Sequence, residues 1–194
     1  MAQAALANGP QTLENFVGGT LARKAAIAVL GSIFLAVLSQ INVPSYPVPV
    51  TLQTLGVMLI GLTFGFRLAT ATVALYLVEG LVGLPVFAGF AAGPAVFIGG
   101  TAGYLFGFLI AAALMGFMAD RGVTKSIPGM AVTLLAGEVV IFGLGVGYLT
   151  YLYGFDKALA YGLYPFVLAD LVKMALAMLI GKGVIKGASS LAHL

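Results

Sequence analysis

Long apolar runs alternate with short irregular stretches along most of the chain. Most runs approach the roughly 20 residues that an α-helix needs to cross the hydrocarbon core of a bilayer. The stretches between them hold charges, prolines or glycine clusters, which interrupt helices. The pattern predicts an all-α integral membrane protein with six transmembrane helices. The predicted spans are residues 22–41, 52–66, 67–84, 95–119, 128–152 and 160–182.

The second and third predicted spans are shorter than the others and are separated only by Phe64-Gly65-Phe66-Arg67. Each falls below the length that crosses a bilayer without tilt or local thinning. Two arrangements are therefore compatible with the pattern. We favour six spans, and the alternative is five spans in which these two merge into one helix.

The composition supports a membrane location. Hydrophobic residues make up 61% of the 194 residues and charged residues 8%, whereas soluble domains contain about 25% charged residues. So few charges cannot cover a surface that faces water. The Lys and Arg residues lie mostly at the ends of predicted spans and form no basic patch, so nucleic-acid binding is not expected.

Residue types that carry much of enzyme chemistry are nearly absent from the chain. There is no cysteine, and the only histidine is His193. This excludes thiol catalysis, thiolate metal sites and histidine-based triads or metal clusters. The stretch Gly181-Lys182-Gly183 lacks the glycine spacing and the Ser or Thr of a phosphate-binding loop. We therefore expect no catalytic residue, no metal ion, no cofactor and no ATP hydrolysis by this chain.

The distribution of Lys and Arg predicts the orientation. In the six-span arrangement Lys157 is the one basic residue on the outer side, and Lys173 lies within the last span. The other basic residues fall on the inner side: Arg23, Lys24, Arg67, Arg121, Lys125, Lys182 and Lys186. Short cytoplasmic loops are enriched in Lys and Arg, so both termini are expected in the cytoplasm.

Three regions are expected along the chain. Residues 1–21 lack the basic start of a signal peptide and are expected to form a cytoplasmic or interfacial lead-in. Residues 22–182 are expected to form the six-helix membrane domain, and residues 183–194 a cytoplasmic tail.

The first predicted outer loop holds a cluster of prolines that is followed at once by hydrogen-bonding side chains. These residues are Pro44, Pro47, Pro49, Thr51, Gln53 and Thr54. The second outer loop, residues 85–94, is also rich in Pro and Gly, and the third, residues 153–159, lies on the same face. Irregular backbone at membrane depth is tolerated where it is buried in protein or lines a cavity. The loops therefore predict either a pocket that opens outward or ordinary short connectors.

Four ionisable side chains lie inside predicted spans: Glu79, Glu138, Asp170 and Lys173. Each costs about 2.5–3.5 kcal/mol or more at the bilayer centre when unpaired, so we expect them to face the bundle interior. Asp170 and Lys173 are three residues apart and share one helix face. They offer an acceptor and a donor to a planar, urea-like group, or they form a self-satisfied ion pair. Glu79 is expected to line the same pocket or to reach the headgroups, and Glu138 to be a partner of Lys173.

Small residues recur at intervals of four on several spans, a spacing that lets helices approach closely. Most of these rows are expected to pack helices inside the bundle. The row that begins with Ala22 and Ala26 is the candidate for contact with a different subunit. The other rows are Gly61 and Gly65, Gly99, Gly103, Gly107 and Ala111, and Gly143 and Gly147.

Several stretches in combination resemble the BioY family, the biotin-binding S components of energy-coupling-factor (ECF) transporters. They are "VPVTLQTLGVMLIGLTFGFRL" (48–68), "LYLVEGLVGLPVFAGF" (75–90), "GGTAGYLFGF" (99–108) and the pair Asp170-x-x-Lys173. The resemblance covers about residues 22–182. It implies a six-helix S component in a bacterial cytoplasmic membrane, with a pocket near the outer face that the first and third inter-helix loops cap.

The resemblance also implies a ligand and partners. The ligand would be biotin, with Asp170 accepting from the ureido N–H groups and Lys173 donating to the ureido oxygen or stabilising Asp170. Further binding residues would be Tyr46, Thr51, Gln53, Glu79, Phe87, Phe90 and Tyr104. The partners would be a transmembrane coupling protein, docked on the Ala22 and Ala26 row, and two ABC-type ATPases that alone use ATP.

Three alternatives stay open at this point. The chain could be an S component for another small vitamin, a membrane enzyme that relies on Asp, Glu, Lys or Tyr chemistry, or an assembly subunit without a ligand. Competition binding would identify another vitamin, and detectable turnover would identify an enzyme. Function that survives the loss of Asp170 and Lys173 would identify an assembly subunit.

Overall fold

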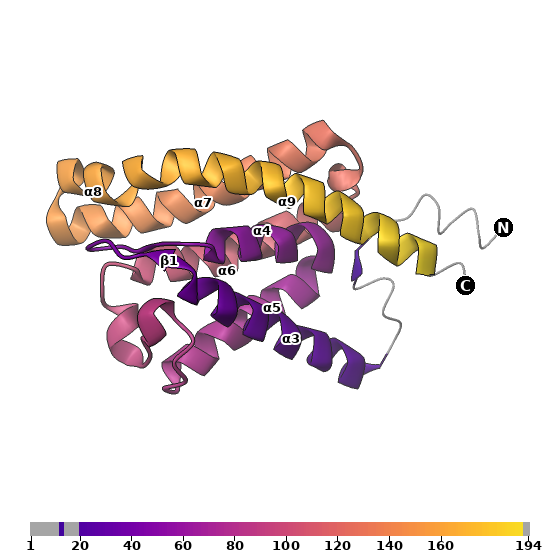
Figure 1. Ribbon diagram of the computed structural model, residues 1–194, viewed down its shortest axis with the longest axis horizontal. Coiled ribbons are helices and arrows are strands. Elements are labelled where there is room, and N and C mark those ends of the chain that lie inside the picture. Colours follow the sequence, from indigo (N-terminus) through magenta and orange to yellow (C-terminus); the bar gives the residue numbers. More distant parts are fainter. Residues whose placement is uncertain (1–11, 14–19, 192–194) are drawn as a thin grey trace.

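The computed structural model describes residues 12–13 and 20–191, with side chains described as far as residue 184. Helices account for most of this part of the chain (Figure 1). The α-helices are α3 (Leu21–Gln40), α4 (Gln53–Phe64), α5 (Phe66–Leu81), α6 (Ala102–Asp120), α7 (Ile127–Tyr153), α8 (Phe155–Gly162) and α9 (Tyr164–Leu191). The short elements are strands β1 (Asn42–Val43) and β2 (Val50–Thr51) and the 3-10 segments η1 (Ala88–Phe90), η2 (Pro94–Phe97) and η3 (Val123–Lys125).

The predicted all-α membrane bundle is confirmed, with α3, α4, α5, α6, α7 and α9 as its six main helices. Four stretches of the described chain are long and apolar enough to cross a membrane: α3, α6, α7 and the α8–α9 stretch. Helices α4 and α5 have 12 and 16 residues and are shorter. They are nevertheless separate helices, because Gly65 between them has φ +87°, a left-handed conformation that ends a helix. The five-span arrangement is therefore wrong.

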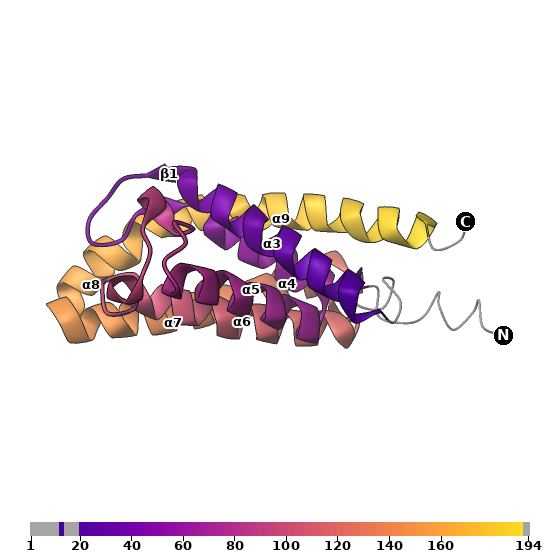
Figure 2. The same cartoon turned by 90° about the horizontal axis from the view of Figure 1, so that it is seen from below.

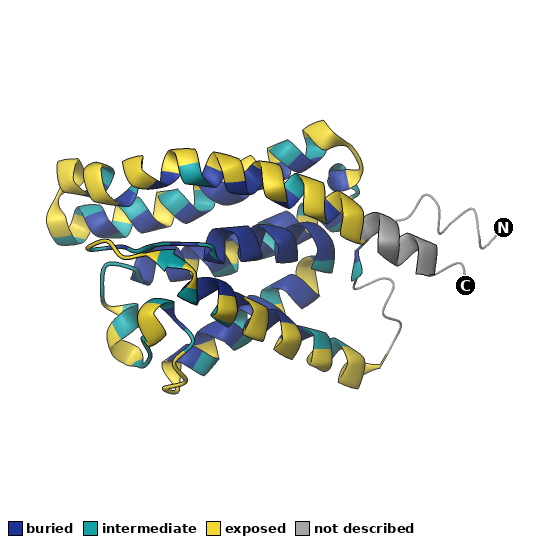
Figure 3. Cartoon of the chain, in the orientation of Figure 1, coloured by how far each residue is buried: buried dark blue, intermediate teal, exposed yellow. Residues whose placement is uncertain are grey.

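Helix α4 lies at the centre of the bundle, and every residue from Gln53 to Thr63 is buried (Figure 3). It contacts α3, α5, α6 and α9. Gly56 and Gly61 of α4 permit this close packing. A Cβ on Gly56 would lie 2.8 Å from Leu35 and Leu38 of α3, and one on Gly61 would lie 2.7 Å from Met115 of α6. At 1.5 Å per residue its 12 residues cover only about 18 Å, less than the bilayer core.

The junction between α4 and α5 is fixed from the far end of α6. Asp120, the last residue of α6, accepts a hydrogen bond from the backbone N–H of Phe66 at 2.8 Å. Its other carboxylate oxygen accepts from Thr12 Oγ1 at 3.0 Å. A carboxylate at a helix N-terminus satisfies an otherwise unpaired N–H and favours the helix dipole. Asp120 therefore caps α5 from another helix.

Helices α6 and α7 approach closely along the predicted small-residue row of α6. A Cβ on Gly103 would overlap the Leu144 backbone, and one on Gly107 would lie 2.9 Å from the Ile141 Cα. Internal packing is therefore the role of this row. The row on α7 differs, because a Cβ on Gly143 or Gly147 would meet no atom within 4 Å.

The irregular segments gather at one end of the bundle. The β1–β2 hairpin, the segment 82–101 and α8 lie together, opposite the start of α3 and the end of α9 (Figures 1 and 2). Two predicted boundaries are corrected here. The second loop is longer than residues 85–94, because α6 begins only at Ala102, and the third contains helix α8 rather than an open connector.

Helix α9 continues to Leu191, past residue 182 where the last predicted span ends. The lead-in predicted for residues 1–21 falls mostly outside the described residues.

Candidate functional site

A cavity lies beneath the hairpin and the segment 82–101. The space that the centre of a water molecule can reach is about 210 Å³, more than ten times the roughly 15 Å³ that one buried water needs. The lining comes from the hairpin, segment 82–101, and helices α4, α6, α7 and α9. The lining residues are Val48, Pro49, Thr51, Gln53, Thr54, Phe87, Ala88, Ala91, Val96, Thr101, Tyr104, Leu105, Phe108, Ile141, Phe142, Phe166, Asp170 and Lys173.

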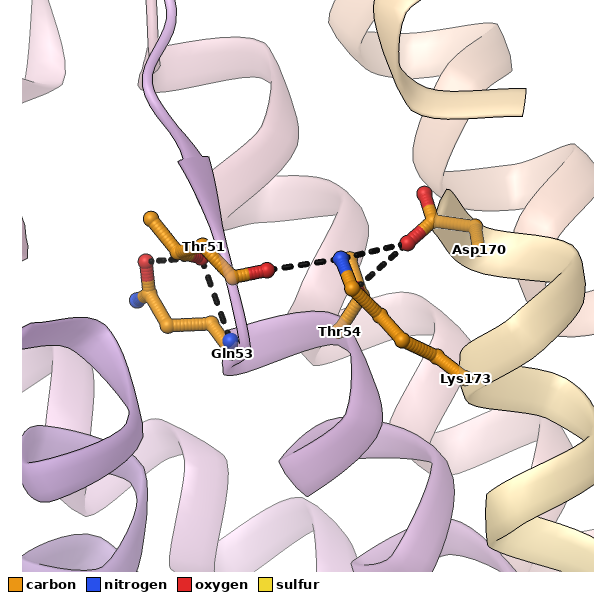
Figure 4. Close-up of polar contacts among 5 residues, drawn as sticks. All are labelled: Thr51, Gln53, Thr54, Asp170 and Lys173. Atoms are coloured by element: carbon orange, nitrogen blue, oxygen red, sulfur yellow. Dashed lines mark hydrogen bonds and ion pairs between the residues drawn. The ribbon is translucent and has the colours of Figure 1, made fainter. Parts of the chain in front are cut away.

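Asp170 and Lys173 of α9 are buried on the cavity lining, 3% and 5% exposed. Lys173 Nζ lies 2.6 Å from Asp170 Oδ1. Thr54 of α4 bridges the pair, because its hydroxyl accepts from Lys173 Nζ at 2.8 Å and donates to Asp170 Oδ1 at 2.9 Å (Figure 4). Lys173 also donates to the carbonyl oxygen of Thr51 at 2.6 Å. The pair therefore joins α9 to α4 and to the base of the hairpin.

The two members of the pair differ in the capacity that they leave free. An ammonium group has three protons, and Lys173 places them on Asp170, Thr54 and Thr51. Asp170 Oδ2, in contrast, is buried and has no hydrogen-bond partner among the described residues. A buried acceptor without a partner is costly, so this oxygen is the part of the pair that a ligand donor can stabilise.

Thr51 and Gln53 form a second polar group on the lining. The Thr51 hydroxyl donates to Gln53 Oε1 and accepts from the Gln53 backbone N–H, both at 3.1 Å. Gln53 Nε2 donates to the hydroxyl of Tyr76 on α5 at 2.7 Å. The amide group is thus held in one orientation while it faces the cavity.

Aromatic rings form much of the remaining wall. Tyr104 stacks on Phe166 with ring centroids 6.1 Å apart, and its hydroxyl donates to the carbonyl oxygen of Gly162 at 2.7 Å. Phe87 is 3% exposed and contacts Tyr76 edge to face. The cavity is therefore mostly apolar with a few placed polar groups, as small-molecule sites usually are.

The structure brings six of the nine residues that the sequence analysis assigned to the ligand site onto one cavity. They are Thr51, Gln53, Phe87, Tyr104, Asp170 and Lys173.

The other three lie outside the cavity lining. Tyr46 is in the hairpin loop, 81% exposed, with its hydroxyl 3.4 Å from that of Tyr153. Phe90 is 68% exposed and has a left-handed backbone conformation, with φ +58°. Glu79 lies on α5 toward α3, where Ser32 Oγ donates to its Oε1 at 2.9 Å.

Sequence reasoning missed Thr54 and Tyr76 as parts of the site. Thr54 joins both members of the charged pair, and Tyr76 orients Gln53. The signal for Thr54 is its position one turn after Thr51 at the start of a short apolar helix. Tyr76 is 0% exposed, and a buried hydroxyl requires a partner. The sequence does not show that this partner is Gln53.

Glu138 is not the partner of Lys173 that the sequence analysis expected. It is 6% exposed, and neither carboxylate oxygen has a hydrogen-bond partner among the described residues. It precedes Ile141 and Phe142 of the cavity lining by three and four positions, so it shares their face of α7. The expectation failed because Thr51, Thr54 and Asp170 already take the three ammonium protons.

We expect Glu138→Met to leave the free energy of unfolding unchanged or to raise it, because an apolar side chain of similar length removes a buried polar group without a partner. Thermal unfolding of the purified protein in detergent measures the effect. Glu138→Ala is the control and should be less stable than Glu138→Met, because it leaves a cavity. A clear loss of stability in Glu138→Met would contradict this expectation.

Ala22 and Ala26 are both exposed on the first turns of α3. No cluster of three Asp, Glu, His or Cys side chains that could hold a metal ion occurs within residues 12–13 and 20–191.

The fold and the cavity together define a class of protein: a multi-pass helical membrane protein with a small-molecule-sized cavity lined by a buried acid–amine pair. The model of the BioY family matches residues 7–190. This chain belongs to the BioY family, which makes it a transport protein rather than an enzyme.

Individual relatives agree with this assignment. The chain is 40% identical to "Biotin transporter BioY" of Thermotoga maritima, over 72% of this chain and 82% of that protein. It is 38% identical to "Probable biotin transporter BioY" of Pyrococcus horikoshii, over 82% of this chain and 96% of that protein. The fold is similar to the crystal structure at 2.1 Å of "the S-component for biotin from an ECF-type ABC transporter". That match has a TM-score of 0.74 at 25% identity and covers 87% of this chain and 95% of the other.

Proposed function

We propose that this chain is the biotin-binding S component of an ECF-type importer. The observation that carries the proposal is the cavity at the end where the irregular segments gather, lined by a buried carboxylate with one oxygen that has no partner among the described residues. Membership of a family whose curated relatives are named biotin transporters supports the choice of ligand.

The chemistry of biotin matches the lining. Its ureido ring has two N–H donors and one carbonyl acceptor, and the fused thioether ring and the aliphatic chain are apolar. Asp170 Oδ2 is an acceptor without a partner, and a hydrogen bond to a charged group contributes about 1.5–3 kcal/mol. An amide nitrogen has two protons, so Gln53 Nε2 keeps one for the ureido oxygen after bonding Tyr76. Phe87, Tyr104 and Phe166 then cover the apolar rings.

In this arrangement Lys173 acts on the ligand indirectly. Its protons are already engaged, so of the two roles that the resemblance implies, stabilising Asp170 fits the geometry better than donating to the ureido oxygen. Lys173 pairs with Asp170 Oδ1 and holds the Thr51 carbonyl, and with it the base of the hairpin.

The partners and the location follow from the same proposal. The chain resides in a bacterial cytoplasmic membrane with both termini in the cytoplasm, and biotin enters from the opposite face. A transmembrane coupling protein docks on α3 at the exposed Ala22 and Ala26, because small residues permit close helix contact. ABC-type ATPases bound to that coupling protein supply the energy.

A binding titration tests the ligand. Purified wild-type protein in detergent should bind labelled biotin with one site per chain, and unlabelled biotin should displace it. Thiamine and riboflavin, two vitamins without a cyclic urea fused to a thioether ring, should not compete. Absence of saturable biotin binding, or equal displacement by either vitamin, would overturn the proposal.

A further inference from the structure

Phe87 is the only aromatic residue that segment 82–101 places on the described cavity lining. Its ring is packed among Tyr76, Gly80 and Phe97. The ring contacts Tyr76 and Phe97 edge to face, at centroid distances of 5.3 and 5.7 Å. It lies over Gly80 of α5, where any Cβ would overlap it. The ring therefore has one well-packed position, and that position depends on where the backbone of residue 87 is held.

The backbone around Phe87 is held by a side chain from a different helix. Gln40, the last residue of α3, donates from Nε2 to the carbonyl oxygen of Phe87 at 3.0 Å. Its Oε1 accepts from the backbone N–H of Phe90 at 3.1 Å. Both ends of one amide group thus close the turn 87–90, which includes two left-handed residues, Gly89 with φ +66° and Phe90 with φ +58°. A non-glycine residue in that region is strained, and the bond to Gln40 offsets part of the strain.

The neighbouring carbonyl is held in the same manner. Val86 O accepts from Ser39 Oγ of α3 at 2.7 Å and from the Tyr76 hydroxyl at 3.0 Å. Segment 82–101 is therefore held through two successive carbonyl oxygens. Residues of α3 donate to both Val86 O and Phe87 O, and Tyr76 of α5 donates to Val86 O. The loop between β1 and β2 differs, because the side-chain hydrogen bond that joins it to another described element is the 3.4 Å pair of Tyr46 and Tyr153.

We propose that Gln40 is a positioning residue for the ligand: it fixes the Phe87 wall and thereby slows ligand dissociation. Gln40 is absent from the cavity lining, so its effect passes through Phe87. The inference rests on the proposed function, because biotin is the ligand used to test it.

The experiment measures the dissociation rate of labelled biotin from the full chain in detergent. Gln40→Met keeps the length of the side chain and removes the hydrogen bonds to Phe87 O and Phe90 N. It also removes the bonds that Nε2 donates within α3, to Ser39 Oγ at 2.8 Å and Ala36 O at 3.4 Å. It should raise the dissociation rate about tenfold. Gln40→Asn is the second variant, because its shorter amide cannot reach residues 87 and 90 together, and it should also dissociate faster than wild type. Asn42→Leu is the matched control. It also removes a hydrogen-bonding amide, but the bonds of this amide go to Ser39 O and Gln40 O and not to segment 82–101, so its rate should stay near wild type.

A double-mutant cycle separates positioning from a general loss of structure. In a Phe87→Ala background the ring that Gln40 positions is already absent, so adding Gln40→Met should change the dissociation rate less than twofold. Wild-type rates in both Gln40 variants, or multiplicative effects of Gln40→Met and Phe87→Ala, would overturn the inference. Failure of the wild-type protein to bind biotin would instead overturn the proposed function, so the two failures are distinguishable.

Discussion

Replacement of Lys173 by methionine is expected to lower the free energy of unfolding by about 3–5 kcal/mol, the usual cost of leaving one member of a buried ion pair without its partner. Asp170 would keep a buried charge with only the Thr54 hydroxyl to satisfy it, and the hairpin would lose the bond from Lys173 to Thr51 O. Thermal or denaturant unfolding of the biotin-free protein in detergent measures the loss.

The double variant Asp170→Leu with Lys173→Met is the control for this prediction. It removes both charges, and well-packed apolar replacements of buried ion pairs are often neutral or stabilising, so it should recover much of the lost stability while losing biotin binding. Equal stability of wild type and Lys173→Met would show that the pair does not hold α9 to α4.

The second large effect is expected from Asp170→Asn, which should weaken biotin binding by at least tenfold. The substitution keeps the shape of the side chain but replaces a charge-assisted hydrogen bond, which contributes about 1.5–3 kcal/mol, by a neutral one. Equilibrium titration with labelled biotin measures the change, at a temperature where both proteins are fully folded.

Asp156→Asn is the matched control, because it makes the same chemical change at an exposed position on α8. Its affinity should equal that of wild type. An unchanged affinity in Asp170→Asn would mean that biotin does not bind this carboxylate, and would contradict the assignment of Asp170 as the acceptor for the ureido N–H groups.

Much of the fold could be predicted from the sequence because lipid imposes a simple constraint. Apolar runs and their interruptions located the six main helices, and Gly65 separates the two short ones, α4 and α5. The ends of elements were less predictable. Residues 95–101 are apolar enough for a helix, but they belong to η2 and the turn that follows it, because apolar composition alone does not distinguish a buried loop from a span.

The site was predictable where the cost of burial is large and local. Asp170 and Lys173 were identified because two charges three residues apart in an apolar helix must pair or serve a ligand. Thr54 could not be identified in this way, since its role depends on α4 and α9 lying side by side. Tyr46 and Phe90 illustrate the same limit, because an aromatic residue in a loop is equally consistent with a cavity wall and with an exposed interface.

The short central helix has a consequence for how the protein responds to its lipid environment. Because the other helices surround α4, the residues that it contributes to the cavity meet no acyl chains. A change in bilayer thickness alters the tilt of helices that contact lipid, whereas Gln53 and Thr54 lie on a helix that is buried among the others. We therefore expect ligand binding by Gln53 and Thr54 to depend little on the acyl-chain length of the surrounding lipid.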